Sequence, residues 1–166
     1  MITNPFRMLR DTGVGRVRYA LRAWLVAVVP SLLLFLVQVV VGIASLRAPA
    51  NVPTGLDWGY SVLLAPIVET ALMLPLAWLL DRAMPRHEGL RIVALAAACA
   101  LAHKLGGNWR QVVNALWPFL VYAATLIAWR KRSSADALAV TAIVHALYNA
   151  SFFAVGMLGA WAGADG

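Results

Sequence analysis

Four side chains that can transfer protons or donate hydrogen bonds lie inside long apolar runs of this sequence: Glu69, His103, His145 and Asn149. Glu69 is the only carboxylate within any of these runs. A charged side chain at the centre of a membrane-spanning helix costs roughly 3 kcal/mol on insertion scales, so such a residue faces a protein interior, a partner or water. Taken alone, Glu69 is equally compatible with an interhelical hydrogen bond and with a functional site.

The spacing of these residues suits one type of chemistry. His145 and Asn149 are four residues apart, which places them on one face of a helix. Counted from the ends of the expected spans, Glu69 lies roughly 17 Å from the outer edge of the membrane, while His145 and Asn149 lie roughly 12 and 18 Å from the inner edge. A carboxylate and an imidazole can share a water and remove its proton, and a second imidazole and an amide can donate to an oxyanion. This is the minimum equipment for amide hydrolysis.

Each of these side chains also has a purely structural interpretation. A single His or Asn in a membrane helix more often bonds to a neighbouring helix, because the bilayer offers it no water. The same holds for Asn114 in another apolar run, whereas Gln38 stands isolated in the first run. The chemical interpretation gains weight because three different runs supply the glutamate, one histidine and the His/Asn pair.

Membrane-spanning helices are the elements that would position these residues. The 166 residues are 62% hydrophobic and 13% charged, with a mean hydropathy of +0.77, which is too apolar for an ordinary soluble domain. The runs do not alternate in polarity as strands of a membrane barrel would. We expect an all-α, polytopic membrane protein with a single domain over residues 24–166. Five spans are expected near residues 24–46, 58–80, 90–105, 112–129 and 137–161.

Basic residues flank these runs unevenly. Residues 1–23 form a basic lead-in that we expect at the membrane interface, broken around Gly13 and Gly15. With five spans, the lead-in and the loops after the second and fourth spans carry 11 of the 14 Lys and Arg residues on one side. The positive-inside rule then places the N-terminus in the cytoplasm. The high content of Ala, Leu, Val and Arg suits a bacterial inner membrane.

The net charge of +7 does not indicate a nucleic-acid-binding protein. The basic residues flank the apolar runs and do not form one patch interleaved with aromatic residues. The expected contact of this chain is therefore the lipid bilayer.

The order of the polar residues resembles the type II CAAX prenyl endopeptidase and bacteriocin-processing family of glutamate-type intramembrane proteases. The likeness covers roughly residues 59–154 and is strongest over residues 139–149, whose pattern is similar to the final His-x-x-x-Asn motif of that family. Pro66-Ile-Val-Glu69 matches the start of the first motif, a Pro-led Glu-Glu-x-x-x-Arg. Here the second Glu is Thr70 and the Arg is Leu74. In the middle motif, Phe-x-x-x-His, Cys99 replaces the Phe and only His103 is kept.

This resemblance implies the roles of the four residues. Glu69 and His103 would activate a water molecule, and His145 with Asn149 would form an oxyanion hole, without a metal ion or other cofactor. The substrate would be a membrane-anchored polypeptide, such as a leader peptide or a sorting tail of an exported protein. Because Thr70 and Leu74 depart from the motif, a catalytically inactive scaffold, immunity or maturation partner of the same fold is the alternative.

Three other chemistries also use these residues. Glu69, His103 and His145 could bind Zn²⁺ with water as the fourth ligand. Cys99 and His103 are four residues apart and could form a thiolate–imidazole pair, although a buried thiol is normally inert. Glu69 and the histidines could relay protons in a transporter, although five spans without repeats are unusual for that function.

Overall fold

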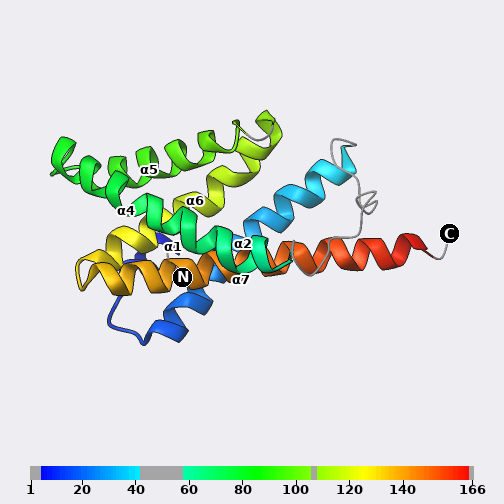
Figure 1. Cartoon of the computed structure of the whole chain (residues 1–166), viewed down its shortest axis with the longest axis horizontal. Coiled ribbons are helices and arrows are strands. Elements are labelled where there is room, and N and C mark those ends of the chain that lie inside the picture. The colour runs from blue at the N-terminus through cyan, green and yellow to red at the C-terminus, as the bar shows by residue number, and fades with distance from the viewer. Residues whose placement is uncertain (1–4, 42–57, 106–107, 165–166) are drawn as a thin grey trace.

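The computed structural model describes residues 5–41, 58–105 and 108–164, and these are helical apart from short turns (Figure 1). After the single turn α1 (Pro5–Met8), the elements are α2 (Arg16–Val40), the π-helix η1 (Tyr60–Leu64), α4 (Ala65–Ala83), α5 (Glu88–Ala102), α6 (Trp109–Arg130) and α7 (Ser134–Ala164). The predicted all-α class is confirmed for this part of the chain.

Four helical segments are long and apolar enough to cross a membrane: Arg16–Val40, Tyr60–Ala83, Trp109–Arg130 and Ser134–Leu158. They overlap four of the five predicted spans and indicate a polytopic membrane protein. The remaining predicted span, near residues 90–105, corresponds to α5. With 15 residues α5 covers about 22 Å, less than the roughly 30 Å of a hydrocarbon core. The fifth span therefore stays a prediction.

The first spanning helix begins earlier than the sequence indicated. α2 starts at Arg16 and not at Trp24, directly after the break predicted at Gly13 and Gly15. No helix-breaking residue separates the second half of the lead-in from the apolar run, so the helix is continuous. The predicted end of this span at residue 46 and the loop at 47–57 lie outside the described residues.

The lead-in packs against the helical bundle. Tyr19 in its second half is buried, donates its hydroxyl hydrogen to the carbonyl oxygen of Leu9 at 2.7 Å and meets the Trp129 ring edge-on. Arg132 donates to the carbonyl oxygen of Thr12 at 2.6 Å. These contacts fix α1 and the start of α2 on the bundle, while the location of this segment at a membrane interface stays a prediction.

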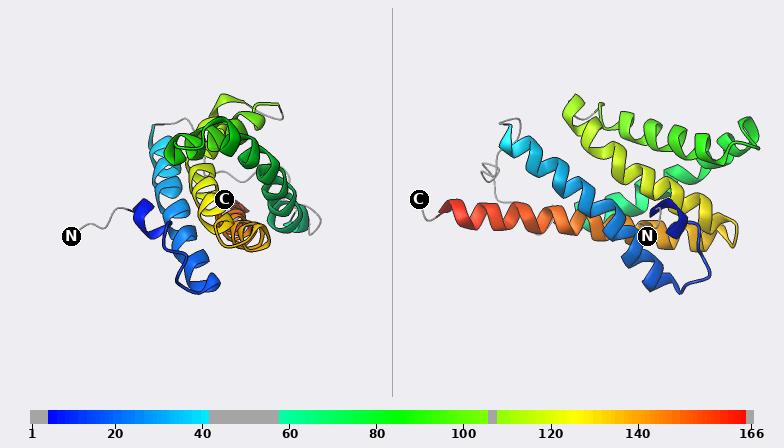
Figure 2. Two further views of the ribbon diagram at one scale, coloured as in Figure 1. Left: turned by 90° about the vertical axis from the view of Figure 1, so that its left-hand side faces the viewer. Right: turned by 180° about the vertical axis from the view of Figure 1, so that it is seen from behind.

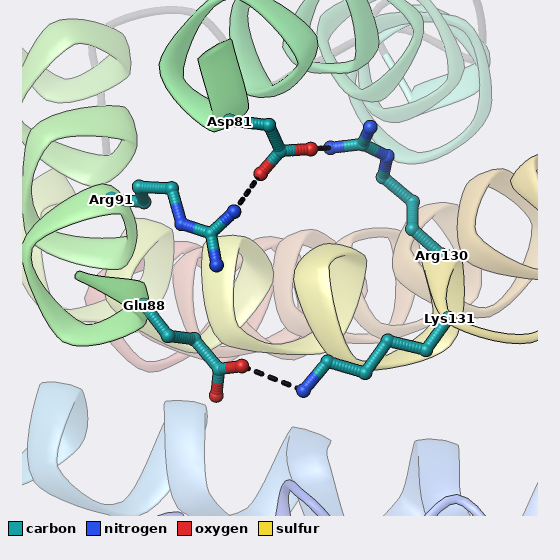
Figure 3. Close-up of polar contacts among 5 residues, drawn as sticks. All are labelled: Asp81, Glu88, Arg91, Arg130 and Lys131. Carbon is teal, nitrogen blue, oxygen red and sulfur yellow. Dashed lines mark hydrogen bonds and ion pairs between the residues drawn. The ribbon is translucent and has the colours of Figure 1, made fainter. Parts of the chain in front are cut away.

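Charged residues from distant parts of the chain meet at one end of the bundle, which we call the basic end; part of it is drawn in Figure 3. Its ion pairs join Asp81 to Arg91 and Arg130, Glu88 to Lys131 and Arg10, and Asp136 to Arg16. The lead-in, the α4–α5 turn and the α6–α7 turn thus lie together, as the charge pattern predicted for one side of a membrane. Which side this end faces stays a prediction.

The two carboxylates drawn in Figure 3 join three helices. Asp81 at the end of α4 bonds to Arg91 of α5 and, at 2.8 Å, to Arg130 of α6. Glu88 at the start of α5 accepts a hydrogen bond from Lys131 at 2.6 Å. This hydrogen bond lowers the pKa of Glu88 against the opposing effect of burial, and the charges of Lys131, Arg10 and Arg91 lower it further.

α6 forms the centre of the bundle. Its residues from Val121 to Trp129 are all buried, and α2, α5 and α7 pack around it. The other helices expose large apolar side chains, among them Leu33 (61% exposed), Leu72 (66%) and Leu158 (69%). Such surfaces are unusual on soluble proteins and suit contact with lipid.

A side chain from α6 compensates for a proline in α2. Pro30 has no N–H, so the carbonyl oxygen of Val26, four residues earlier, lacks its helical donor. The indole Nε1 of Trp117 donates to this oxygen at 2.9 Å. This hydrogen bond gives the carbonyl oxygen of Val26 a donor, which lipid cannot provide, and it connects α2 to the middle of α6.

Candidate active site

A cavity of about 870 Å³ lies among η1, α4, α5, α6 and α7. All four residues predicted from the sequence line it: Glu69 from α4, His103 at the C-terminal end of α5, and His145 and Asn149 from α7. Asn114 from α6 lines it as well, whereas no Lys or Arg is among its described lining residues. The tertiary structure therefore brings together the side chains that the spacing had grouped, while their chemical roles stay predictions.

Glu69 and His145 face each other across part of this cavity. The Glu69 Oε2 and His145 Nε2 atoms are 3.7 Å apart, within ion-pair range but too far for a hydrogen bond. The His145 side chain is only 5% exposed, and that of Glu69 is 34% exposed. Neither Oε2 of Glu69 nor Nδ1 of His145 has a hydrogen-bond partner among the described residues. Both groups therefore retain unused hydrogen-bonding capacity at a buried position, where polar atoms normally have partners.

The backbone sets the tautomer of His103. Its Nδ1 lies 3.1 Å from the carbonyl oxygen of Cys99, one turn earlier at the end of α5. A carbonyl oxygen can only accept, so Nδ1 carries the hydrogen and the neutral ring keeps its lone pair on Nε2. His103 can therefore accept a proton through Nε2. The contact uses the backbone of Cys99, so the thiolate–imidazole pair gains no support from this geometry.

One aromatic ring contacts both imidazoles. The Phe119 centroid lies 5.2 Å from that of His103 and 5.8 Å from that of His145, both in edge-to-face geometry. Tyr122 stacks on His145 with centroids 4.4 Å apart. The aromatic contact shared by the two histidines thus comes from α6. No local sequence signal could reveal it, because Phe119 reaches the site only through the packing of α6.

Asn149 donates a hydrogen bond to a carbonyl oxygen of η1 that a nearby proline leaves without a helical donor. In this π-helix the N–H of Ala65 bonds to the carbonyl oxygen of Tyr60, five residues back. The next donor in that pattern would be residue 66, but Pro66 has no N–H, so the carbonyl oxygen of Ser61 lacks a helical partner. Asn149 Nδ2 donates to it at 2.7 Å. One of its two amide hydrogens is therefore used structurally, and the other remains for a ligand.

Gln38 is not isolated, contrary to the expectation from the sequence. Its Nε2 donates to Asn114 Oδ1 at 2.6 Å, and Asn114 Nδ2 approaches Gln38 Oε1 at 3.5 Å. Gln38 lies near the C-terminal end of α2 and Asn114 near the N-terminal end of α6. Because these two spans run in opposite directions, both residues lie near the same end of the bundle, which was the available signal for this pair. The paired amides satisfy each other in an apolar setting and join α2 to the cavity wall.

Thr70 and Leu74, the two positions that differ from the first motif, are both neutral and both suit their apolar surroundings. Thr70 is fully buried, and Leu74, one turn later, packs against the hydrophobic core. A carboxylate at position 70 would be buried, and without a cation nearby its cost would be several kcal/mol. Because both positions are neutral here, neither leaves an unpaired charge. Glu69 is consequently the only acid of this segment, and it is the one that lines the cavity.

The geometry gives no support to the zinc interpretation. Within the part of the chain that the structure describes, no three His, Cys, Asp or Glu side chains are grouped so that they could hold a metal ion. The site is thus best described as one carboxylate and two imidazoles around a shared cavity.

Comparison of this chain with protein-family models, with curated proteins and with solved structures found no match.

Proposed function

We propose that this protein is an intramembrane endopeptidase that hydrolyses a peptide bond of a membrane-anchored polypeptide with a water activated by Glu69 and His103. The convergence of Glu69, His103 and His145 on one cavity of a chain with four apolar spanning segments carries the proposal. In the fuller form of the proposal, α5 is a fifth crossing and the basic end faces the cytoplasm of a bacterial cell.

The proposed reaction uses each group according to its surroundings. Glu69 takes a proton from water as the water oxygen attacks the scissile carbonyl carbon, and Nε2 of His103 holds that water by accepting a hydrogen bond. The attack converts the carbonyl oxygen to an oxyanion, which accepts hydrogen bonds from His145 and from the second amide hydrogen of Asn149. Transfer of the proton from Glu69 to the leaving nitrogen then accompanies cleavage of the C–N bond.

A catalytically inactive scaffold or maturation partner is the second candidate. The observation that favours it is the occupation of Asn149 and Asn114 by interhelical hydrogen bonds to Ser61 and Gln38. These two bonds are what a purely structural role predicts. Glu69 and His145 have no such bond at Oε2 and Nδ1, which is why the enzyme is preferred.

The test compares processing of membrane proteins from the source cell by the wild type and by the Glu69→Gln, His103→Ala and His145→Ala variants. We expect each variant to lose at least about 100-fold in rate, the usual contribution of a general acid or base. Glu88→Gln is the matched control, because it removes a carboxylate that lies at the basic end. Unchanged processing by well-folded Glu69→Gln protein would refute the protease.

A chelator provides the test of the zinc alternative. We expect processing by the wild-type protein to continue after treatment with the chelator. Loss of processing that returns on addition of Zn²⁺ would favour the two-histidine, one-carboxylate metal site instead.

A further inference from the structure

The cavity extends from the middle of the bundle toward the end opposite the basic end. Tyr60 is the first residue of η1, His103 caps the end of α5, and Gln111 is in the first turn of α6, and all three line the cavity. Glu69 is 14 residues from Ala83 and Asn114 is 16 residues from Arg130, so they lie about 21 and 24 Å from the basic ends of their helices. These two residues are thus displaced toward the opposite end, whereas His145 lies near the middle of the segment Ser134–Leu158.

The tip of the α5–α6 hairpin stops short at that opposite end. Figures 1 and 2 show α2 and α7 extending beyond it along the long axis of the molecule. Since α5 covers about 22 Å, its C-terminal end would lie roughly 8 Å inside a 30 Å hydrocarbon core. Lys104, Asn108 and Arg110 near this tip are exposed. Charged side chains at such depth thin the bilayer locally and draw in water and headgroups.

The residues at the mouth of the cavity are the exposed ones. Tyr60 is 62% and Leu72 is 66% exposed on one side, and Ala102 and Gln111 are exposed on the other. The mouth therefore lies between the η1–α4 segment and the α5–α6 tip. One wall is apolar and the other carries amides, which suits an unwound apolar peptide whose backbone needs hydrogen-bond partners.

We propose that the cavity is entered from the side of the membrane opposite the basic end, so that the substrate is a polypeptide whose scissile bond lies in the outer, exported half of the bilayer. The outward direction follows from the positive-inside rule, which places the basic end in the cytoplasm. The identification of a substrate rests on the proposed protease function. The location of the entrance rests only on the placement of the cavity and on the charges.

Cysteine accessibility tests the entrance without requiring catalysis. Cys99 is the sole cysteine, so a Cys99→Ala background allows single reporters at chosen sites. Ala102→Cys reports on the cavity mouth with little change in size, and Gln111→Cys is a second reporter there. Arg86→Cys, exposed in the α4–α5 turn, reports on the basic end. The probe is a charged maleimide that does not cross membranes.

The expected labelling is opposite for the two kinds of reporter. In right-side-out vesicles Ala102→Cys and Gln111→Cys react and Arg86→Cys does not, and in inside-out vesicles the pattern is reversed. Labelling of the mouth reporters and Arg86→Cys from the same side would overturn the inference. Labelling of the mouth from the cytoplasmic side alone would overturn it too.

A second experiment tests whether the substrate uses this entrance, by measuring processing after modification of the reporters. Maleimide added from the exported side to Ala102→Cys vesicles is expected to reduce processing at least tenfold, while cytoplasmic modification of Arg86→Cys leaves processing unchanged. Continued processing after complete modification of the mouth would refute entry there. Absence of processing in untreated wild-type vesicles would count against the proposed function and leave the labelling result valid for the entrance.

Discussion

The basic end and the cavity both gather polar side chains from distant parts of the chain, but their carboxylates differ in how many cations they contact. Asp81 and Glu88 at the basic end each bond to two cations. Glu69 in the cavity has only His145 within 4 Å among the described basic groups, at 3.7 Å and without a hydrogen bond. The first arrangement neutralises charge between helices, while the second leaves a base available.

This difference indicates which carboxylates serve folding. Arg91 and Arg130 have side chains that are only 14% and 18% exposed, so Asp81 compensates two nearly buried positive charges. Removing one partner of a buried ion pair is strongly destabilising because it leaves the other charge uncompensated. Glu69, whose side chain is half-buried, compensates no such cation, so the neutral substitution Glu69→Gln removes a charge and leaves no uncompensated cation behind.

The largest expected effects come from two conservative substitutions, one of which should remove activity without loss of stability and the other of which should lower stability. Glu69→Gln should abolish processing, by at least about 100-fold, and leave the thermal unfolding midpoint in detergent unchanged or higher. Asp81→Asn should retain the catalytic groups but lower the free energy of unfolding by about 2–3 kcal/mol, since Arg91 and Arg130 would then repel each other.

Arg91→Met in the Asp81→Asn background serves as the control for this prediction. It removes one of the two uncompensated cations and should recover part of the lost stability. A large drop in the unfolding midpoint of Glu69→Gln, with Asp81→Asn unaffected, would reverse the assignment of the two regions.

A smaller effect on the free energy of unfolding is expected at Asn149, a cavity-lining residue that also makes an interhelical hydrogen bond. Asn149→Ala removes the donor to the carbonyl oxygen of Ser61, which should cost about 1–2 kcal/mol. Pro66→Ala supplies a backbone N–H that can take over this role. The cost of Asn149→Ala should therefore be smaller in the Pro66→Ala background, as measured by a double-mutant cycle of unfolding free energies. Strict additivity would mean that Pro66 is not the reason for the bond.

The smallest effect concerns pH at the basic end. The hydrogen bond from Lys131 lowers the pKa of Glu88 from 4.5 in the folded protein. Stability from this pair is thus fully present above pH 4.5 and is lost as the pH falls through the lowered pKa. Lys131→Met should reduce stability at pH 7 by less than about 1 kcal/mol, because the pair is partly exposed.

The measurement compares unfolding midpoints of the wild type and Lys131→Met at pH 7 and at pH values below 4.5. The difference between the two proteins should shrink in acid, while Lys131→Arg should resemble the wild type at every pH. A difference that is as large in acid as at pH 7 would show that Lys131 acts through packing and not through the charge of Glu88.

Much of the fold could be predicted because helix formation in an apolar chain is a local matter. Each spanning segment satisfies its own backbone hydrogen bonds, so length and composition suffice to locate it. Four of the five predicted spans and the common end of the basic loops could be found in this way. Glu69, His103, His145 and Asn149, which line one cavity, were grouped by their polarity, spacing and depth. The start of α2 at Arg16 was missed because a charged surface helix continues into the span without a local break.

What only the tertiary structure decided depends on how the helices are rotated and packed against one another. Pro30 and Pro66 show in the sequence which carbonyl groups lose a helical donor, but not that Trp117 and Asn149 would supply the replacements. Composition could identify Glu69 as a costly carboxylate. Only packing could place it 3.7 Å from His145 in a cavity that lacks a described Lys or Arg, because that distance is set by three-dimensional contacts between segments far apart in the chain.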